Sequence, residues 1–271
     1  MKKYIPTNLN CEIFKAIAGA IWGRVTRAHN VGVNLKEVGI TADIVADVLW
    51  KYHKKGASIG VYAREGWNEV TYGSDLDVFV EVAKDQYVWF PMQAKLLKLR
   101  NVYNEIYDPK AAKQQWEKLL DLKKIANCNP YYLLYNGNNI VKKIPLDNCW
   151  SKVKFTQFGC SLVEPEIVAA VTLAKHPTPP KFDDFHPNLA QPWKVITCCP
   201  VHYAGSPTYT IYDIKNAMNQ KGDKYKNLAS FGKLNDIPIN DNIFEGNAIL
   251  NASREADWNP DYTFIVPISE N

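Results

Sequence analysis

The sequence predicts an α/β protein with a mixed central sheet flanked by helices. Apolar residues recur at three- and four-residue spacing in residues 10–29, which is typical of a helix. Apolar and polar residues alternate in residues 75–82, and a second strand-like run follows at 87–94. An amphipathic pattern at 111–126 then precedes the aromatic run 131–135. Helices, paired strands, a helix and a further strand are the order expected of an α/β sandwich.

Composition sets the class of protein. The 271 residues are 46% hydrophobic and 22% charged, with 8 Trp and 15 Tyr, which is the composition of a folded globular chain and not of a disordered one. No apolar run reaches the ~18–20 residues of a membrane span, and no apolar stretch follows Lys2 and Lys3 as in a secretory signal. The six cysteines show no CxxC spacing, so we expect reduced thiols, a cytoplasmic location and no membrane partner.

Two helices are expected before the sheet. In residues 10–29 the apolar stripe includes Ile13, Ile17 and Ile21. A second helix is predicted from Thr41, as N-cap, to about Lys54. Its acids Asp43 and Asp47 lie one turn apart on the same side.

The next segment predicts a β-hairpin. A first strand is expected at 59–62, followed by a polar loop and the turn Gly73-Ser74. The strand at 75–82 places four apolar residues on one face, and the polar break 83–86 leads to the second strand at 87–94. The opposite face of the strand at 75–82 carries Asp75, Asp77, Phe79 and Glu81.

Three polar side chains of this hairpin predict a metal site. Gln93 and Lys95 are two residues apart, so both point to one face, and Asp75 lies at the start of the neighbouring strand. Mg²⁺ prefers carboxylate, carbonyl and water oxygens, and hydrolysis of a phosphodiester also needs a cation near the attacking water. We therefore expect Asp75 and Gln93 to bind Mg²⁺ or Mn²⁺ and Lys95 to orient the water.

The spacing of these residues carries a family resemblance. Gly73-x-Asp75 followed by Gln93-x-Lys95 resembles the PD-(D/E)xK nuclease superfamily, in the variant with Gln in place of the second acid that Mrr-like restriction endonucleases show. The Pro before the Asp is missing. A group of uncharacterised bacterial proteins shares a longer pattern, which includes Gln93-Ala94-Lys95-Leu96, Tyr103, Gln115-Trp116, residues 130–136, Gly159-Cys160-Ser161-Leu162, Pro192-Trp193 and Cys198-Cys199.

The resemblance implies a fold and an activity. The fold would be restriction-endonuclease-like, and the activity that of a metal-dependent endonuclease acting on DNA in a bacterial restriction or phage-defence setting, as a homodimer or with a defence partner protein. The superfamily often adds an acid from the helix before the sheet to the metal site. Asp43, Asp47 and Glu37 are the candidates for that acid, and Asp43 is favoured.

The middle of the chain is basic. Between Lys95 and Lys154 there are twelve Lys or Arg against five Asp or Glu, an excess that favours a polyanion as partner. We expect Lys98 and Arg100, just after the second hairpin strand, to meet nucleic-acid phosphates. The lysines within 110–124 are interpreted as a solvated helix face.

The chain is interpreted as a single domain, 1–271, with a core at about 30–175 and a C-terminal elaboration at about 186–271. A helix is expected at 164–175 and a Pro-rich loop at 176–187. A strand at 193–199, a helix at 213–231 and a strand at 262–266 complete the prediction.

Two other functions remain open. Asp75-x-Asp77 is similar to the metal-binding strand of the nucleotidyltransferase superfamily, in which two carboxylates hold two Mg²⁺ ions. That family has a Gly-Ser upstream, and the nearest candidate here, Gly60-Val61, lacks the Ser. The alternative is a nucleic-acid-binding module without catalytic activity, which the Gln at position 93 allows.

Overall fold

The structure is a computed structural model that describes residues 8–54, 61–65, 73–139, 147–148, 151–198, 205–214 and 260–266. Within this part of the chain, seven strands form one sheet in the order β1-β9-β2-β3-β4-β7-β8. The pairs β2–β3 and β4–β7 are antiparallel, whereas β3–β4 and β2–β9 are parallel, so the sheet is mixed. The strands are β1 (Val61–Glu65), β2 (Leu76–Ala83), β3 (Gln86–Leu96), β4 (Tyr131–Tyr135), β7 (Cys160–Val163), β8 (Gln191–Pro192) and β9 (Pro260–Val266).

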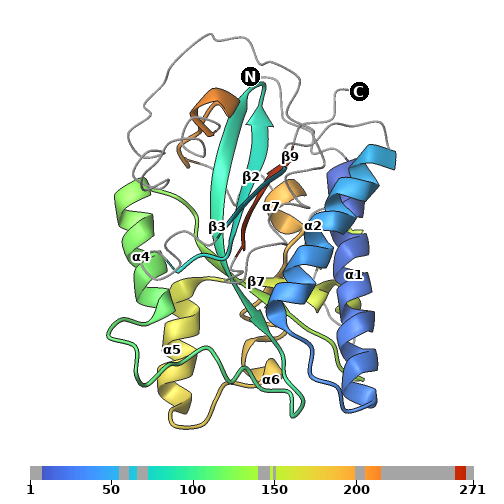
Figure 1. The fold of residues 1–271 in the computed structure, drawn as a ribbon, viewed down its shortest axis with the longest axis vertical. Helices are drawn as coiled ribbons and strands as arrows, with labels where there is room; N and C mark the ends of the chain where they lie inside the picture. Colours follow the sequence, from blue (N-terminus) through green and yellow to red (C-terminus); the bar gives the residue numbers. More distant parts are fainter. Residues whose placement is uncertain are drawn as a thin grey trace.

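Helices cover both faces of the sheet, which confirms the predicted fold class. Helices α1 (Asn8–Asn30) and α2 (Glu37–Lys54) lie on one side, and α4 (Gln115–Ala126) and α5 (Pro165–Lys175) lie on the other (Figure 1). Shorter elements are η1 (Phe155–Gly159), α6 (Phe182–Phe185), α7 (Val195–Cys198) and the small pair β5 (Asp147–Asn148) and β6 (Ser151–Lys152). Among the described residues, no helix is both long and apolar enough to span a membrane.

The period of two along the strands divides the core between the two faces. Leu76 and Val78 of β2 and Phe90 of β3 join residues of α1 and α2, such as Ile17 and Ile44, in one buried cluster. Each such side chain stabilises the fold by about 1.5–3 kcal/mol through burial. The alternate residues of the same strands point to the opposite face.

The opposite face of the sheet is also buried. Phe79 and Trp89 pack there with Leu122 of α4, and Tyr132 of β4 packs with Trp116. Gln93 and Lys95 share this face with Trp89, because each lies an even number of residues from it. The same alternation therefore brings the two polar side chains under the α4 side of the molecule.

Helix α1 approaches the sheet closely because glycine faces it. A Cβ atom on Gly159 would collide with the carbonyl oxygen of Ala18, and one on Gly137 would collide with the carbonyl oxygen of Trp22. The helix backbone can therefore lie directly over the ends of η1 and β4.

Two predicted helix boundaries differ from the structure. Helix α2 begins at Glu37, so Thr41 is not its N-cap: its hydroxyl hydrogen-bonds Glu37 O at 3.2 Å and Tyr135 Oη at 2.9 Å. Helix α4 begins at Gln115 and not at residue 111, because the backbone N–H of Gln114 donates to Glu117 Oε2 at 2.7 Å and sets the start there.

The strand predicted at 193–199 is wrong. Residues Val195–Cys198 form the short helix α7, because Lys194 O accepts hydrogen bonds from both the N–H and the hydroxyl of Thr197. Trp193 anchors this turn by donating its indole N–H to Phe14 O at 2.8 Å. The predicted strands at 75–82, 87–94, 131–135 and 262–266 are confirmed with small shifts of their ends. Most of the predicted helix at 213–231, and residues 59–60 of the first strand, lie outside the described residues.

Candidate metal centre

The edge of β3 holds the carboxylate of Asp75. Strand β2 begins at Leu76, opposite Met92, and the N–H of Asp75 still donates to Met92 O at 2.8 Å. Beyond Met92 no strand within the described residues continues along this edge, because β9 pairs with the other side of β2. The next N–H on the edge belongs to Ala94, and it donates to Asp75 Oδ2 at 2.8 Å. The carboxylate of Asp75 thus supplies the hydrogen-bond acceptor that a neighbouring strand would otherwise provide.

A second carboxylate lies one step further along the same edge. Alternate N–H groups of a strand point to one side, so the N–H of Leu96 follows that of Ala94 after about 7 Å. The backbone of Leu96 lies near the carboxylate of Glu37, in the first turn of α2, and helps to lower its pKa. Burial raises the pKa of Tyr132, and the charges of Asp75 and Glu37 raise it further, which places both acids near that ring.

Gln93 lies beside the first carboxylate. Its side chain is 1% exposed, and its Nε2 donates to Asp75 Oδ2. Its carbonyl oxygen Oε1 is buried with no hydrogen-bond partner among the described residues, and the same holds for Glu37 Oε2. Two buried acceptor oxygens without a donor are costly, so they mark a place where a ligand would satisfy them. A half-turn of the Gln93 amide would exchange Nε2 with Oε1 and turn the oxygen toward Asp75.

Lys95 extends from the same face of β3. It is 6% exposed, and its Nζ lies 3.9 Å from Glu37 Oε1. Burial raises the pKa of Glu37 to about 7, although the charge of Lys95 opposes this change. The two side chains therefore form a long ion pair, and each can still contact a further group.

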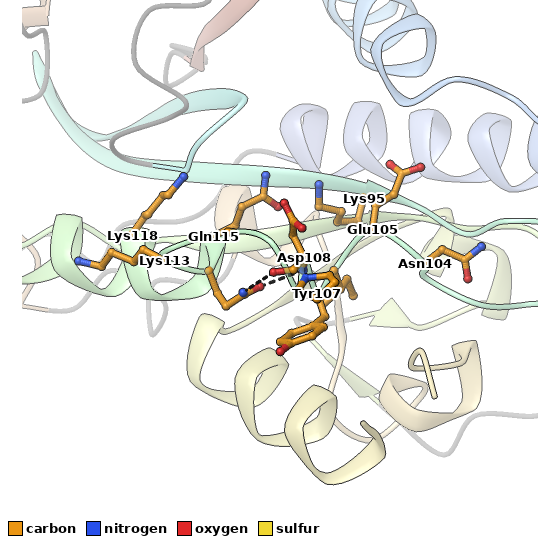
Figure 2. A pocket seen from close by; sticks show the side chains of 12 residues that line it. Lys95, Asn104, Glu105, Tyr107, Asp108, Lys113, Gln115 and Lys118 are labelled. Carbon is orange, nitrogen blue, oxygen red and sulfur yellow. Dashed lines mark hydrogen bonds between the residues drawn. The ribbon is translucent and has the colours of Figure 1, made fainter. Parts of the chain in front are cut away.

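A pocket of about 440 Å³ opens at Lys95. The residues that line it come from the end of β3, the following loop and the first turn of α4: Lys95, 104–109, 111, 113–115 and 118. Figure 2 shows Lys95, Gln115 and the carboxylate of Asp108 pointing toward one another, with Lys118 extending from the α4 side. The pocket gives Lys95 a route to a bound substrate.

Gly73 brings the Asp75 turn against α4. Its φ of +70° is one that L-residues rarely adopt, and a Cβ there would lie 2.9 Å from Gln115 O and 3.2 Å from Lys118 Cβ. The glycine of the Gly73-x-Asp75 motif is therefore required by close approach as well as by conformation.

The acid favoured from the sequence lies elsewhere. Asp43 is exposed and forms an ion pair with Arg24 of α1. It follows Glu37 by six residues, so it points about 120° away around the helix and lies about 9 Å further along it. The structure brings Glu37, and not Asp43, to Lys95.

The two predicted nucleic-acid contacts have different surroundings. Lys98 is partly buried, and its Nζ lies 3.1 Å from Glu105 Oε1 on the rim of the pocket. Arg100 is exposed in the turn after β3, with a φ of +38°. Lys98 thus adjoins the candidate site, while Arg100 remains a surface residue of the adjoining turn.

The second carboxylate of the Asp75-x-Asp77 pair is built into the core. Asp77 is 1% exposed, and its Oδ1 accepts the indole N–H of Trp89 at 3.1 Å. It lies near Cys128, whose pKa burial and the Asp77 charge both raise. This position disfavours the nucleotidyltransferase interpretation, which needs both carboxylates to reach metal ions from solvent.

The comparison with known families covers nearly the whole chain. Residues 10–258 match DUF6615, a family of unknown function. The chain belongs to DUF6615. No curated protein and no solved structure matches it.

The donor set of this DUF6615 chain fits Mg²⁺ in chemistry. Asp75, Gln93 and Glu37 offer only oxygen atoms as metal ligands, and two of these, Gln93 Oε1 and Glu37 Oε2, accept no hydrogen bond from the residues that the structure describes. Among the described residues, no group of three or more His, Cys, Asp or Glu side chains forms a ready metal cluster. A site here would therefore use two carboxylates and an amide, and water would complete the shell.

Sequence reasoning about this DUF6615 member missed part of the site. Glu105 and Lys118 both line the pocket, although the helical pattern predicts a solvated face for Lys118 and no motif marks Glu105. The sequence pattern favours Asp43 over Glu37, because it predicts a helix that starts at Thr41 and leaves Glu37 outside it. Helix α2 begins at Glu37, so its first turn brings that carboxylate to the end of β3.

Proposed function

We propose that this protein is a metal-dependent nuclease that hydrolyses phosphodiester bonds, with DNA as its substrate. The observation that carries the proposal is the gathering of two carboxylates at the end of β3: Asp75 accepts the N–H of Ala94 beside Gln93, and Glu37 lies 3.9 Å from Lys95. The D-x(n)-QxK resemblance supports the same activity. Of these groups Lys95 lines a pocket, so its ammonium is within reach of a substrate.

Asp75, Glu37 and the carbonyl oxygen of Gln93 would hold the Mg²⁺. When bound, Mg²⁺ supplies charge that stabilises the phosphoryl oxygens in the transition state. Gln93 must then present Oε1 and not Nε2 to Asp75, which requires a half-turn of its amide group. Oε1 has no hydrogen-bond partner among the described residues, so this half-turn breaks no hydrogen bond at the oxygen.

Lys95 would act on the substrate itself. Its ammonium is almost fully buried, and a charge in such surroundings interacts more strongly than it does in water. It would donate hydrogen bonds to the attacking water and to a non-bridging phosphate oxygen. Glu37, at 3.9 Å, would keep that ammonium aimed at the metal side of the pocket.

The biological setting is proposed from the resemblance alone. A bacterial restriction or phage-defence role, in the cytoplasm, would fit a nuclease of this type, as a homodimer or with a partner of the same system. A dimer would provide two sites for the two strands of a duplex.

A cleavage assay tests the proposal. Purified protein is incubated with supercoiled, linear and single-stranded DNA and with RNA, with Mg²⁺, Mn²⁺ or EDTA. We expect metal-dependent cleavage of DNA by the wild type and a loss of at least about 100-fold in rate for Lys95→Ala. Lys84→Ala is the matched control, because Lys84 is exposed at the far turn of the same hairpin. Equal activity of Lys95→Ala and wild type, or no cleavage of any substrate, would refute the assignment.

A further inference from the structure

The pocket beside Lys95 extends further than the metal site needs. It spans about 440 Å³ and reaches from the end of β3 to the first turn of α4. Asp75 and Gln93 do not line it, whereas Lys118, Gln115 and Asp108 do. A substrate group other than the one attacked would therefore occupy the α4 part of this space.

Lys118 differs from its neighbouring lysines on α4. Lys113 and Lys124 pair with Asp121, and Lys123 pairs with Glu166 at 2.9 Å. None of the ion pairs formed within the described residues uses Lys118, although it is only partly exposed. Figure 2 shows Lys118 extending toward the strands, whereas Lys113 points away from Lys95. Lys118 is thus a cation available to a ligand in the pocket.

The pocket is suited to a phosphate and not to a base. Tyr107 lies in the lining, but its ring stacks on Trp116, with ring centroids 6.2 Å apart, and also contacts His176. In Figure 2 the ring points away from Lys95. A nucleobase would need such a ring as a stacking surface, so the remaining contacts are polar ones.

The Asp75 turn sets the separation of the two subsites. Gly73 lies against the first turn of α4 at Gln115 and Lys118, and Asp75 follows two residues later, so its Cα is at most about 7 Å away. Lys118 and the metal site are therefore neighbours on the scale of successive phosphates of one nucleic-acid strand.

We propose that this pocket binds a backbone phosphate adjacent to the one that is cleaved, with Lys118 as its cationic contact. The inference rests on the proposed nuclease function, because it names the substrate group next to the reacting one. The negative charge of Asp108 opposes the binding of a phosphate, because its carboxylate points into the pocket. Its Oδ1 accepts the N–H of Lys110 at 2.9 Å. The pocket lining holds three lysines against two carboxylates, and the contact from Lys118 strengthens the binding of the phosphate.

Two variants at the pocket should act in opposite directions. Lys118→Ala should weaken the binding of a DNA oligonucleotide roughly tenfold, irrespective of its base sequence, and reduce the salt dependence of the Kd by about one in slope. Asp108→Asn keeps the hydrogen bond to Lys110 but removes the negative charge, so it should tighten binding. Lys124→Ala is the matched control, because Lys124 is exposed on the same helix.

Binding is measured by fluorescence anisotropy with single-stranded DNA, duplex DNA and RNA of equal length, with Ca²⁺ in place of Mg²⁺, at several salt concentrations. Cleavage is measured separately with Mg²⁺ over a range of substrate concentrations, where Lys118→Ala should raise the KM by a larger factor than it lowers the kcat. Equal affinities for Lys118→Ala and Lys124→Ala in a protein that cleaves would overturn the phosphate subsite and leave the nuclease intact. Binding that depends on Lys118, in a protein that never cleaves, would support the subsite and refute the nuclease. Failure of the wild type to bind any of the three would overturn the subsite.

Discussion

The carboxylate of Glu37 lies 3.9 Å from the ammonium of Lys95, and the backbone of the next residue of β3, Leu96, lies near that carboxylate. The first turn of α2 is therefore fixed to the end of β3. Because Asp75 is held by Ala94 on the same strand edge, two acids, an amide and an amine occupy one short stretch of backbone.

Substitution of Glu37 tests which helix acid belongs to the site. Glu37→Gln keeps the size of the side chain but removes its charge, and should lower cleavage by at least about tenfold and weaken Mg²⁺ binding, because one carboxylate ligand is lost. Asp43→Asn, on the same helix, should retain cleavage, since Asp43 pairs with Arg24. Steady-state cleavage rates over a range of Mg²⁺ concentrations give both values. The reverse order, with Asp43→Asn inactive and Glu37→Gln active, would show that Asp43, which the sequence favours, is the helix acid of the site.

A third acid at position 93 should make folding depend on the metal. Gln93→Glu places a carboxylate against Asp75 in a buried site, and two unit charges about 4 Å apart repel by up to about 4 kcal/mol at an effective dielectric constant of 20. The variant should therefore melt well below the wild type in EDTA and recover most of the difference in Mg²⁺. Gln86→Glu, exposed at the start of the same strand, should melt like the wild type in both buffers. A Gln93→Glu protein whose Tm ignores Mg²⁺ would count against a cation at this position.

Two glycines with similar φ angles allow the cost of backbone conformation to be separated from the cost of a steric contact. Gly73 and Gly32 have φ of +70° and +72°, but a Cβ on Gly32 meets nothing within 4 Å. Gly32→Ala should cost about 1–2 kcal/mol from its backbone conformation alone. Gly73→Ala should cost more and also lower cleavage, because the turn before Asp75 must move away from α4. Urea denaturation and the cleavage assay measure the two effects. Equal losses in stability, with full activity at both, would mean that the contact with α4 is unimportant.

The hairpin β2–β3 was predictable because alternation is a local pattern, and three of the site residues come from that hairpin. Glu37 was not separable from Asp43 by pattern, because the choice depends on which face of α2 meets β3.

Other misses have the same physical origin. The apolar run after Pro192 fits a buried strand or a buried helix equally well, and only the contact of Trp193 with Phe14 decides between them. The position of β9 between β1 and β2 joins segments far apart in the chain, which no local pattern encodes. The pocket at Lys118 likewise depends on how residues 104–113 fold over the end of β3.

The buried side chain of His186 should make stability fall in mild acid. His186 bonds Ser161 Oγ at 2.7 Å and Phe182 O at 3.0 Å, and burial lowers its pKa from 6.5 to about 4. As pH falls the unfolded chain binds this proton first, so stability is full above pH 6.5 and is lost between 6.5 and about 4, by on the order of 3 kcal/mol.

Denaturant titrations at several pH values between 7 and 4 measure this loss. His186→Gln should be less stable than the wild type at pH 7 but should lose less of its stability between pH 6.5 and 4. His176→Gln, at an exposed histidine, should keep the wild-type pH dependence. An unchanged slope in His186→Gln would assign the acid sensitivity to other groups.

A crystal structure of the protein with Mn²⁺ tests the central claim most directly. The account predicts an anomalous difference peak at about 2.1 Å from a carboxylate oxygen of Asp75, with Glu37 and the carbonyl oxygen of Gln93 turned toward the ion. A fully soaked crystal with no peak at Asp75, and with Gln93 Nε2 still donating to that carboxylate, would contradict it.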